Sequence, residues 1–202
     1  MRFVLASQSP ARLAVLRAAG VEPVVRVSGV DEDAVAASLV DPTPEQLVTA
    51  LALAKAEAIA AGAADTEVIV GCDSMLLTSD GEVHGKPGTV DVARERWKRM
   101  AGTTGTLLTG HAVLLVHDGT VVDRAVDHEA TTVRFGRPTD DELESYLATG
   151  EPLHVAGAFT LDGLGGWFVD GIDGDPSSVI GISLPLTRAL LRRLGVSVSD
   201  IW

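Results

Sequence analysis

Two long β-rich runs joined by the dipeptide Asp118-Gly119 constrain the fold more than any other feature of this chain. The runs cover residues 106–116 and 121–133, and Asp-Gly between two strands is a strong signal for a tight hairpin turn. Asp80-Gly81 is a second signal of the same kind. Because a short hairpin joins neighbouring antiparallel strands, the sequence predicts a sheet that contains antiparallel pairs.

Shorter apolar runs and helical patterns surround these hairpins. Apolar runs predict strands at residues 2–6, 24–27 and 67–71, and residues 72–78 are expected to continue the last strand after a turn or bulge. Helices are predicted from Ser9-Pro10 to Gly20, from Thr43 through a long alanine-rich segment, over 90–100, from Thr139 to Ala148 and over 184–194. Residues 28–42 are expected to be loop, and 150–181 irregular but ordered by Phe159, Trp167 and Phe168. The fold class is therefore α/β with a mixed sheet.

Length and composition narrow the function. A chain of 202 residues with 46% hydrophobic content can bury a full core, and we expect one folding unit over residues 1–202. The single cysteine, Cys72, and a first apolar run too short for a signal peptide favour the cytoplasm and no membrane segment. A net charge of −12 argues against binding a nucleic-acid polymer but is compatible with a small nucleotide bound with a divalent cation.

The stretch Ser7-Gln8-Ser9-Pro10-Ala11-Arg12 leads from a strand end into a helix N-terminus. Backbone N–H groups and the helix dipole favour a phosphate there, and the hydroxyls of Ser7 and Ser9 add donors. Arg12 falls in the first helical turn, where the dipole disfavours a cation unless an anion is nearby. The alternative is an ordinary helix cap with an exposed arginine.

Lys55 lies in the middle of the apolar stripe of the alanine-rich helix rather than at its margin. A lysine is almost never buried without a partner, so its ammonium either reaches an anion in a cleft or extends out along its stem to water. Its central place on the stripe favours the anion.

Further charged residues follow glycine-rich or buried segments. Asp73 follows the apolar run 68–70, where a carboxylate suits a general base or metal ligand, although a turn-capping role is an alternative. Lys86, between Gly85 and Pro87, suits a phosphate contact or a solvated surface. Asp31-Glu32-Asp33 offers oxygen ligands for Mg²⁺ or Mn²⁺, or forms a solvated acidic run.

Several well-known sites are absent from the sequence. There is no P-loop pattern, no G-x-S-x-G nucleophile elbow and no Cys/His cluster with zinc spacing.

In order along the chain, these motifs resemble the Maf family of nucleotide pyrophosphatases. The resemblance covers nearly the whole chain and rests on Leu5-Ala6-Ser7-Gln8-Ser9-Pro10-Ala11-Arg12, Ala54-Lys55-Ala56, Gly71-Cys72-Asp73-Ser74, Gly85-Lys86-Pro87, Leu108-Thr109-Gly110 and Gly174-Asp175-Pro176-Ser177-Ser178-Val179-Ile180-Gly181. It implies an elongated mixed sheet with a central cleft between two lobes, related to the inosine triphosphatase fold, and a homodimer.

The resemblance also implies an activity and roles for individual residues. The activity is hydrolysis of a nucleoside triphosphate to a monophosphate and pyrophosphate, with Mg²⁺ or Mn²⁺. Asp73 matches the proton acceptor of the family, and the residues that match phosphate or metal contacts are Ser7, Arg12, Glu32, Lys55 and Lys86. Glu32 matches the metal contact, with Asp31 and Asp33 beside it.

Departures from the family pattern affect the expected substrate. Ala11 stands where a second arginine is usual, and Asp162 stands where glutamine is frequent, in the segment that tunes base recognition together with Arg12 and Ser74. Arg12 with Ser74 favours a pyrimidine nucleotide over 7-methyl-GTP. Rival functions are an enzyme that removes deaminated purine nucleotides, a nucleotide-binding regulator of septum formation with little turnover, and a plain nucleotide-binding module.

Overall fold

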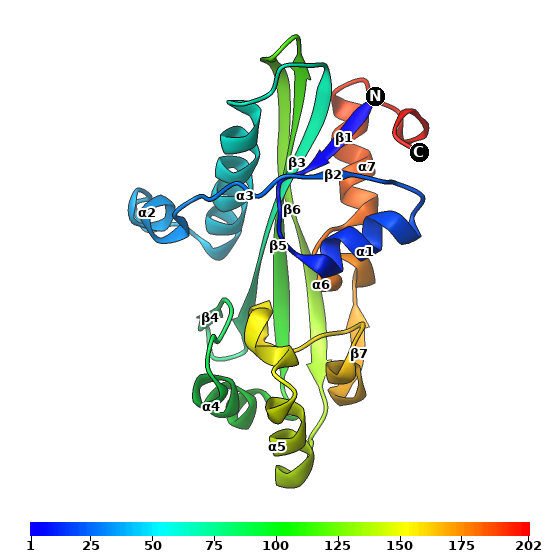
Figure 1. Ribbon diagram of the computed structural model, residues 1–202. Coiled ribbons are helices and arrows are strands. Elements are labelled where there is room, and N and C mark those ends of the chain that lie inside the picture. The colour runs from blue at the N-terminus through cyan, green and yellow to red at the C-terminus, as the bar shows by residue number, and fades with distance from the viewer. The chain divides into compact units, whose positions relative to one another are not determined.

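The computed structural model describes residues 1–202 and has a mixed α/β architecture (Figure 1). The strands are β1 (Arg2–Leu5), β2 (Val24–Val25), β3 (Glu67–Thr78), β4 (Val83–His84), β5 (Thr104–His117), β6 (Thr120–Phe135) and β7 (Val169–Asp173). The α-helices are α1 (Pro10–Ala18), α2 (Glu32–Ala37), α3 (Pro44–Ala60), α4 (Val90–Met100), α5 (Asp140–Ala148), α6 (Pro176–Ile180) and α7 (Leu184–Arg193). Four short 3-10 helices are η1 (Glu151–His154), η2 (Ala156–Ala158), η3 (Leu164–Phe168) and η4 (Val198–Asp200).

The strands form one sheet in the order β2-β1-β3-β5-β6-β7, and β4 pairs with β3. Strand β1 is parallel to β2 and β3, whereas β4 is antiparallel to β3 and β7 to β6. Asp118 and Gly119 have φ values of 46° and 76°, and they connect the neighbouring strands β5 and β6 as the predicted two-residue turn. The mixed sheet is therefore confirmed. None of the helices combines the length and the hydrophobicity that a membrane-spanning helix needs.

Contacts divide the chain into two compact units. Unit 1 comprises Met1–Asp73, Thr109–Glu129 and Gly181–Trp202. Unit 2 comprises Ser74–Leu108 and Ala130–Ile180. Strands β3, β5 and β6 supply residues to both units. That all 202 residues fold as one unit remains a prediction.

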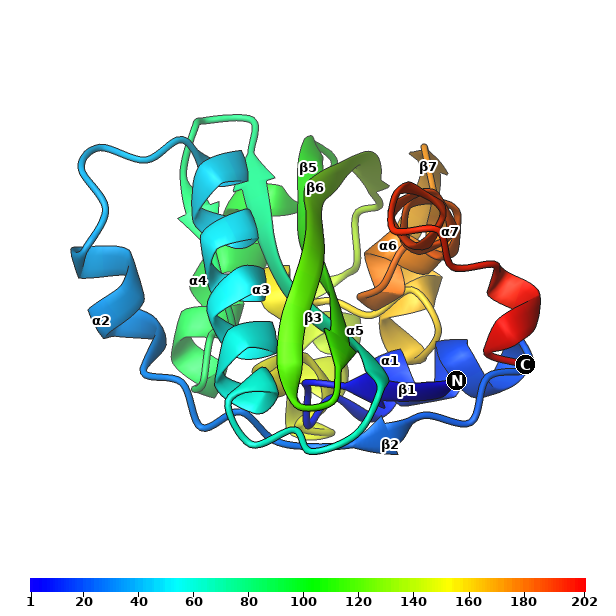
Figure 2. The same cartoon turned by 90° about the horizontal axis from the view of Figure 1, so that it is seen from above.

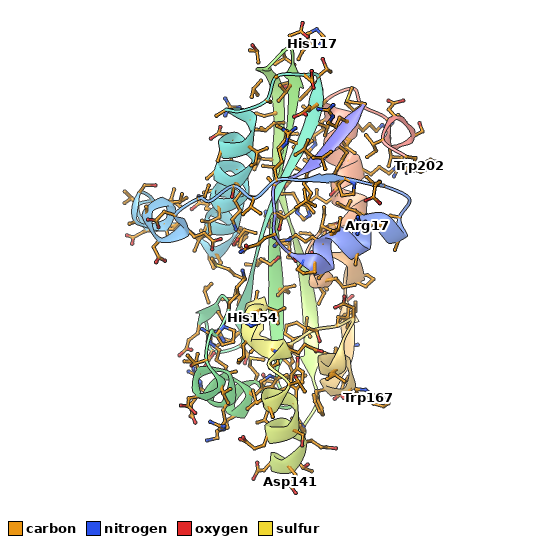
Figure 3. The ribbon with its side chains drawn as sticks, viewed as in Figure 1. Arg17, His117, Asp141, His154, Trp167 and Trp202 are labelled. Atoms are coloured by element: carbon orange, nitrogen blue, oxygen red, sulfur yellow. The ribbon has the colours of Figure 1, made fainter.

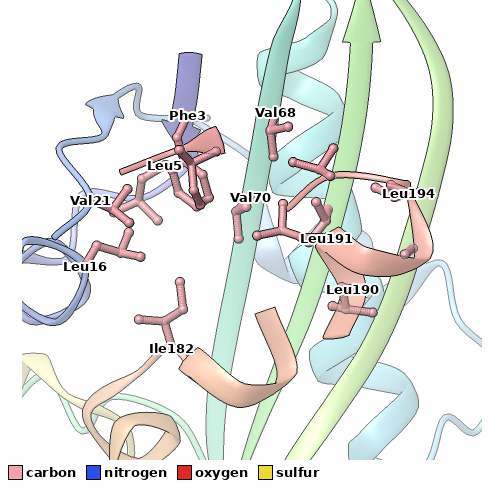
Figure 4. Close-up of a cluster of buried hydrophobic side chains, with 14 of the residues drawn as sticks. Phe3, Leu5, Leu16, Val21, Val68, Val70, Ile182, Leu190, Leu191 and Leu194 are labelled. Carbon is pink, nitrogen blue, oxygen red and sulfur yellow. The ribbon is translucent and has the colours of Figure 1, made fainter. Parts of the chain in front are cut away.

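In unit 1, helix α3 lies on one side of the strands and helices α1 and α7 lie on the other (Figures 1 and 2). Successive residues of β1 point to opposite faces, so Phe3 and Leu5 join one hydrophobic cluster and Val4 and Ala6 the other. The first cluster gathers side chains from β1, α1, β3 and α7 together with Ile182 (Figure 4). Burial on both faces explains why residues 3–5 of β1 and 68–70 of β3 are continuously apolar.

Helix α3 approaches the sheet unusually closely because two glycines face it. A Cβ added to Gly71 of β3 would lie 2.2 Å from the backbone oxygen of Ala52, and one added to Gly110 of β5 would lie 2.2 Å from that of Val48. Neither separation is sterically allowed. The absence of side chains at these two positions therefore sets the distance between helix and sheet.

In unit 2, the buried Trp97 of α4 organises the core. Its ring makes edge contacts with Phe135, Tyr146 and Phe168, at centroid distances of 5.8, 6.2 and 6.0 Å. Its indole N–H donates to the backbone oxygen of Ala158 at 2.7 Å. Helices α4 and α5 are thereby packed together over one aromatic cluster.

Several sequence-based expectations were wrong in detail. Residues 28–42 are not all loop, because Asp31 caps the short helix α2 by accepting the N–H of Ala34 at 3.0 Å. None of the residues of α2 is buried, so no apolar periodicity marked it. Strand β3 runs through Gly71 without the expected turn or bulge, since its glycine serves helix packing.

Two other expectations need adjustment. Strand β2 is confined to Val24–Val25 rather than 24–27. The segment 150–181 contains strand β7 and helix α6 as well as 3-10 turns. Phe159 and Phe168 pack in the unit 2 core as expected, but Trp167 is 85% exposed and points outward (Figure 3).

The substitution Gly71→Ala tests the close approach of α3. The new methyl group would overlap the helix backbone, so we expect a loss of at least about 2 kcal/mol in the free energy of unfolding. The matched control is Gly62→Ala, where an added Cβ has only one neighbour, at 3.9 Å, and where we expect a change below about 1 kcal/mol. Urea denaturation of both variants checks this, and equal losses would contradict the packing argument.

Candidate functional site

The first part of the site lies where β1 leads into α1. Ser9 caps α1 and Pro10 occupies its first turn, as predicted. The buried hydroxyl oxygen of Ser7 accepts the N–H of Ser9 and an Nη1–H of Arg12, both at 3.1 Å. The Nε–H of Arg12 donates to the backbone oxygen of Gly181 at 2.7 Å. The guanidinium is thus oriented at a helix N-terminus, which itself attracts anions.

Lys55 is buried and paired, not extended to solvent. Lys55 is 8% exposed, and its Nζ lies 2.6 Å from Oδ1 of Asp73 and 2.7 Å from Oε1 of Glu32. The buried face of α3 comprises Val48, Leu51, Ala52, Lys55, Ala56 and Ala60, so Lys55 does occupy a core-facing position. Of the two alternatives for this lysine, the structure has the one in which it reaches an anion.

Asp73 lies in β3 and is 7% exposed. Burial raises the pKa of its carboxyl group above the ordinary value, while the charges of Lys55 and Arg12 act in the opposite direction. The neighbouring Cys72 is fully enclosed, and burial raises the pKa of its thiol to about 11. A protonated, inaccessible thiol is a poor nucleophile, so the reactive group of this pair is the carboxyl.

Glu32 is the member of the acidic run that joins the site. It opens helix α2, its side chain is about half exposed, and it contacts the ammonium of Lys55. Asp31 is engaged as the helix cap. The fold therefore brings together Arg12, Glu32, Lys55 and Asp73, all within unit 1, although they come from distant parts of the sequence.

The remaining predicted residues belong to unit 2. Ser74 is half-buried in β3, and Lys86 and Asp162 are exposed. The backbone before Lys86 is held by Arg96, whose Nη1–H donates to the oxygen of Gly85 at 2.7 Å. The sequence did not point to Arg96, because a single arginine on a charged helix has no distinguishing pattern.

Glu151 organises the loop that carries Asp162. Its carboxylate accepts hydrogen bonds from the hydroxyl of Thr160 and from the N–H groups of Leu164 and Gly165, the latter two at 3.2 and 3.1 Å. This carboxylate thereby closes the loop around the exposed Asp162. Sequence reasoning missed Glu151, since its partners are mostly backbone groups that leave no residue signature.

Comparison with known proteins identifies the family of this chain. Residues 2–194 match the family described as Maf-like protein. The chain belongs to the Maf family. A protein of Saccharopolyspora erythraea named nucleoside triphosphate pyrophosphatase is 66% identical over 205 residues, covering 100% of this chain and 97% of its own length. Proteins with the same name from Rhodococcus erythropolis and Nocardia farcinica are 66% and 63% identical, covering 100% and 99% of this chain and 96% of their own lengths.

The substitution Lys55→Met tests the electrostatic balance at Asp73. Without the ammonium, burial raises the pKa of Asp73 further. A carboxyl whose pKa is raised by folding stabilises the folded state while it is protonated, and this contribution disappears as the pH rises from the unfolded pKa, about 3.9, through the folded one. We expect the stability deficit of the variant to widen as the pH rises from about 4 to 8, by about 1.4 kcal/mol for each tenfold weakening of the acidity of Asp73.

Urea denaturation at a series of pH values measures this deficit. Lys98→Met is the matched control, because Lys98 is exposed on α4 and pairs only with the exposed Glu95. The control is expected to show a small, nearly constant difference from the wild type. A Lys55→Met deficit that does not change with pH would contradict the assigned coupling between Lys55 and Asp73.

Proposed function

We propose that this Maf protein is a nucleoside triphosphate pyrophosphatase that hydrolyses the bond between the α- and β-phosphates and releases a monophosphate and pyrophosphate. The buried contact between Lys55 and Asp73 carries the proposal, because it holds a carboxylate beside a cation in a site that also contains Arg12. Relatives that are 66% identical over 97% and 96% of their own lengths bear the name of this activity. The chain is a hydrolase of that class.

In the proposed complex, the cations hold the triphosphate. Arg12 and the N-terminus of α1 face the phosphate oxygens, with Ser7 as a further donor. Lys55 has three N–H donors, of which the two carboxylate contacts use two, and the third is directed to a phosphate oxygen. Lys86 supplies another positive charge. These groups offset the charge that develops on the leaving pyrophosphate, which is the main requirement of phosphoryl transfer.

Asp73 acts as the general base. Its raised pKa makes it a stronger proton acceptor than an exposed aspartate, while Lys55 and Arg12 keep it ionised. It takes a proton from the attacking water. The oxygen of this water bonds to the α-phosphorus as the bond between the α-phosphorus and the oxygen that bridges it to the β-phosphorus breaks. The bridging oxygen leaves as part of pyrophosphate.

The donor set suits a magnesium or manganese ion that arrives with the nucleotide. No three His, Cys, Asp or Glu side chains gather into a protein-only metal site. Mg²⁺ usually takes one or two carboxylates and fills its other positions with phosphate oxygens and water. The half-exposed Glu32 is the proposed protein ligand. When bound, the ion neutralises charge on the phosphate oxygens.

The proposed substrate is a pyrimidine or modified nucleotide. Arg12, Ser74 and Asp162 are assigned to base recognition by their match to the family pattern, with Asp162 in place of a glutamine. A homodimer in the cytoplasm, acting on free nucleotides rather than nucleic acid or membrane, completes the proposal.

Pyrophosphate release tests both activity and substrate. We would assay dTTP, UTP, CTP, ATP, GTP, 7-methyl-GTP and ITP with Mg²⁺ or Mn²⁺, for the wild type beside Asp73→Asn. We expect release from a pyrimidine or modified subset, and a loss of about 10²- to 10⁴-fold in kcat for Asp73→Asn, because that variant lacks the base. Asp118→Asn is the matched control, since Asp118 lies exposed in the β5–β6 turn at a φ of 46° that asparagine also adopts.

Each outcome has a separate meaning. Near-wild-type turnover by Asp73→Asn removes Asp73 from the role of base. Preference for 7-methyl-GTP or ITP overturns the pyrimidine assignment but retains the reaction. Tight nucleotide binding without release from any substrate favours the regulator of septum formation.

A further inference from the structure

Residues 181–183 connect two side chains that are far apart in the sequence. The backbone oxygen of Gly181 accepts the Nε–H of Arg12 at 2.7 Å. Two residues later, the backbone N–H of Ser183 donates to Nε2 of His111 at 2.8 Å. Arg12 and His111 therefore hold the two ends of the same short segment.

The partners of His111 determine its protonation state. A backbone N–H can only donate, so Nε2 must be an acceptor toward Ser183. Nδ1 lies 3.0 Å from the backbone oxygen of Thr109, which can only accept, so Nδ1 must carry the proton. His111 is thus a neutral imidazole in one tautomer, fully buried on β5.

The segment between these contacts has little freedom. Gly181 has a φ of 135°, and a Cβ there would lie 3.2 Å from both Cγ and Nε of Arg12. Ile182 is fully buried and its side chain extends into the cluster that contains Leu16 and Val70 (Figure 4). Ser183 is also buried, and its hydroxyl caps α7 by accepting the N–H of Leu186 at 3.1 Å. A shift at Ser183 is therefore passed along the backbone to the oxygen that orients Arg12.

We propose that His111 is a positioning residue for Arg12, acting through the backbone of residues 181–183. The inference rests on the proposed role of Arg12 in holding the nucleotide phosphates. His111 fixes Ser183, and with it the Gly181 oxygen that aims the guanidinium beside Ser7. The positioning depends on Nε2, which accepts the Ser183 N–H. The contact of Nδ1 with the Thr109 oxygen sets the tautomer.

Two amide substitutions separate these contacts. His111→Asn places its amide near the position of Nδ1, so it can still donate to Thr109 but is too short to reach Ser183. His111→Gln extends an amide to the position of Nε2 and restores an acceptor for the Ser183 N–H. The two variants bury the same polar group, so they differ mainly in the contact on which the inference depends.

A double-mutant cycle with Arg12→Ala provides the test. We expect His111→Asn to lower kcat/KM at least about fivefold in the wild-type background. In the Arg12→Ala background we expect a decrease of less than about twofold, because the guanidinium that His111 positions is absent. His111→Gln is expected to recover most of the loss. The cycle is repeated on the Kd of a non-hydrolysable nucleoside triphosphate analogue, which requires binding but no turnover.

A matched control excludes a general loss of stability. Val116→Ala removes buried volume from the same strand, β5, at a fully buried position in the other hydrophobic cluster of unit 1. Its effect on kcat/KM is expected to be the same in both backgrounds. If His111→Asn does not fold, as judged by thermal unfolding, His111→Leu takes its place in the cycle.

The results distinguish this inference from the proposed function. Equal losses with and without Arg12, or no loss in either background, overturn the positioning role of His111. A wild type that binds the analogue but releases no pyrophosphate from any nucleotide overturns the proposed enzyme alone, and the Kd cycle then decides the role of His111.

Discussion

The close contact between helix α3 and the sheet is the constraint on which the site depends. Gly71 and Gly110 present bare backbone to α3, so helix and strands approach within distances that no side chain would permit. At that separation, Lys55 of α3 reaches Asp73, two residues beyond Gly71 on the same strand. The close packing at Gly71 and Gly110 therefore also places Lys55 beside Asp73.

Charge balance follows from that packing. Burial alone would favour a neutral carboxyl at Asp73, and an unpaired buried lysine would be equally costly. Placing Lys55 between Asp73 and Glu32 compensates both, while Arg12 adds positive charge nearby. In a chain with a net charge of −12, two cations therefore balance two carboxylates at this one site.

Backbone acceptors and donors order the less regular parts of the protein. The oxygens of Gly181, Gly85 and Ala158 accept from Arg12, Arg96 and Trp97 respectively. In the loop around Asp162 the backbone is the donor instead, and the carboxylate of Glu151 accepts hydrogen bonds from its N–H groups. Long segments without regular secondary structure can be rigid when polar side chains satisfy their backbone in this way. The segment 150–181 is ordered for this reason as much as for its aromatic residues.

The sequence by itself determined most of the helices and strands and identified several residues of the candidate site. Capping residues marked α1, α3 and α5, and Asp118-Gly119 marked the main hairpin, because these signals act over a few neighbouring residues. The apolar stripe of α3 identified Lys55 as a buried cation in need of an anion. The short helix α2 was missed, since it buries no residue and so carries no periodic pattern.

Only the tertiary structure decided which groups meet. Lys55 acquires Asp73 and Glu32 as partners through strand pairing and helix packing, and Gly71 proves to be a packing position rather than a turn. His111, Arg96 and Glu151 act on backbone atoms of distant residues, and a backbone atom is the same whatever the residue. Helix caps, turns and apolar stripes can therefore be predicted from the sequence, because they depend on neighbouring residues. Contacts with the backbone of distant residues form only when the chain folds.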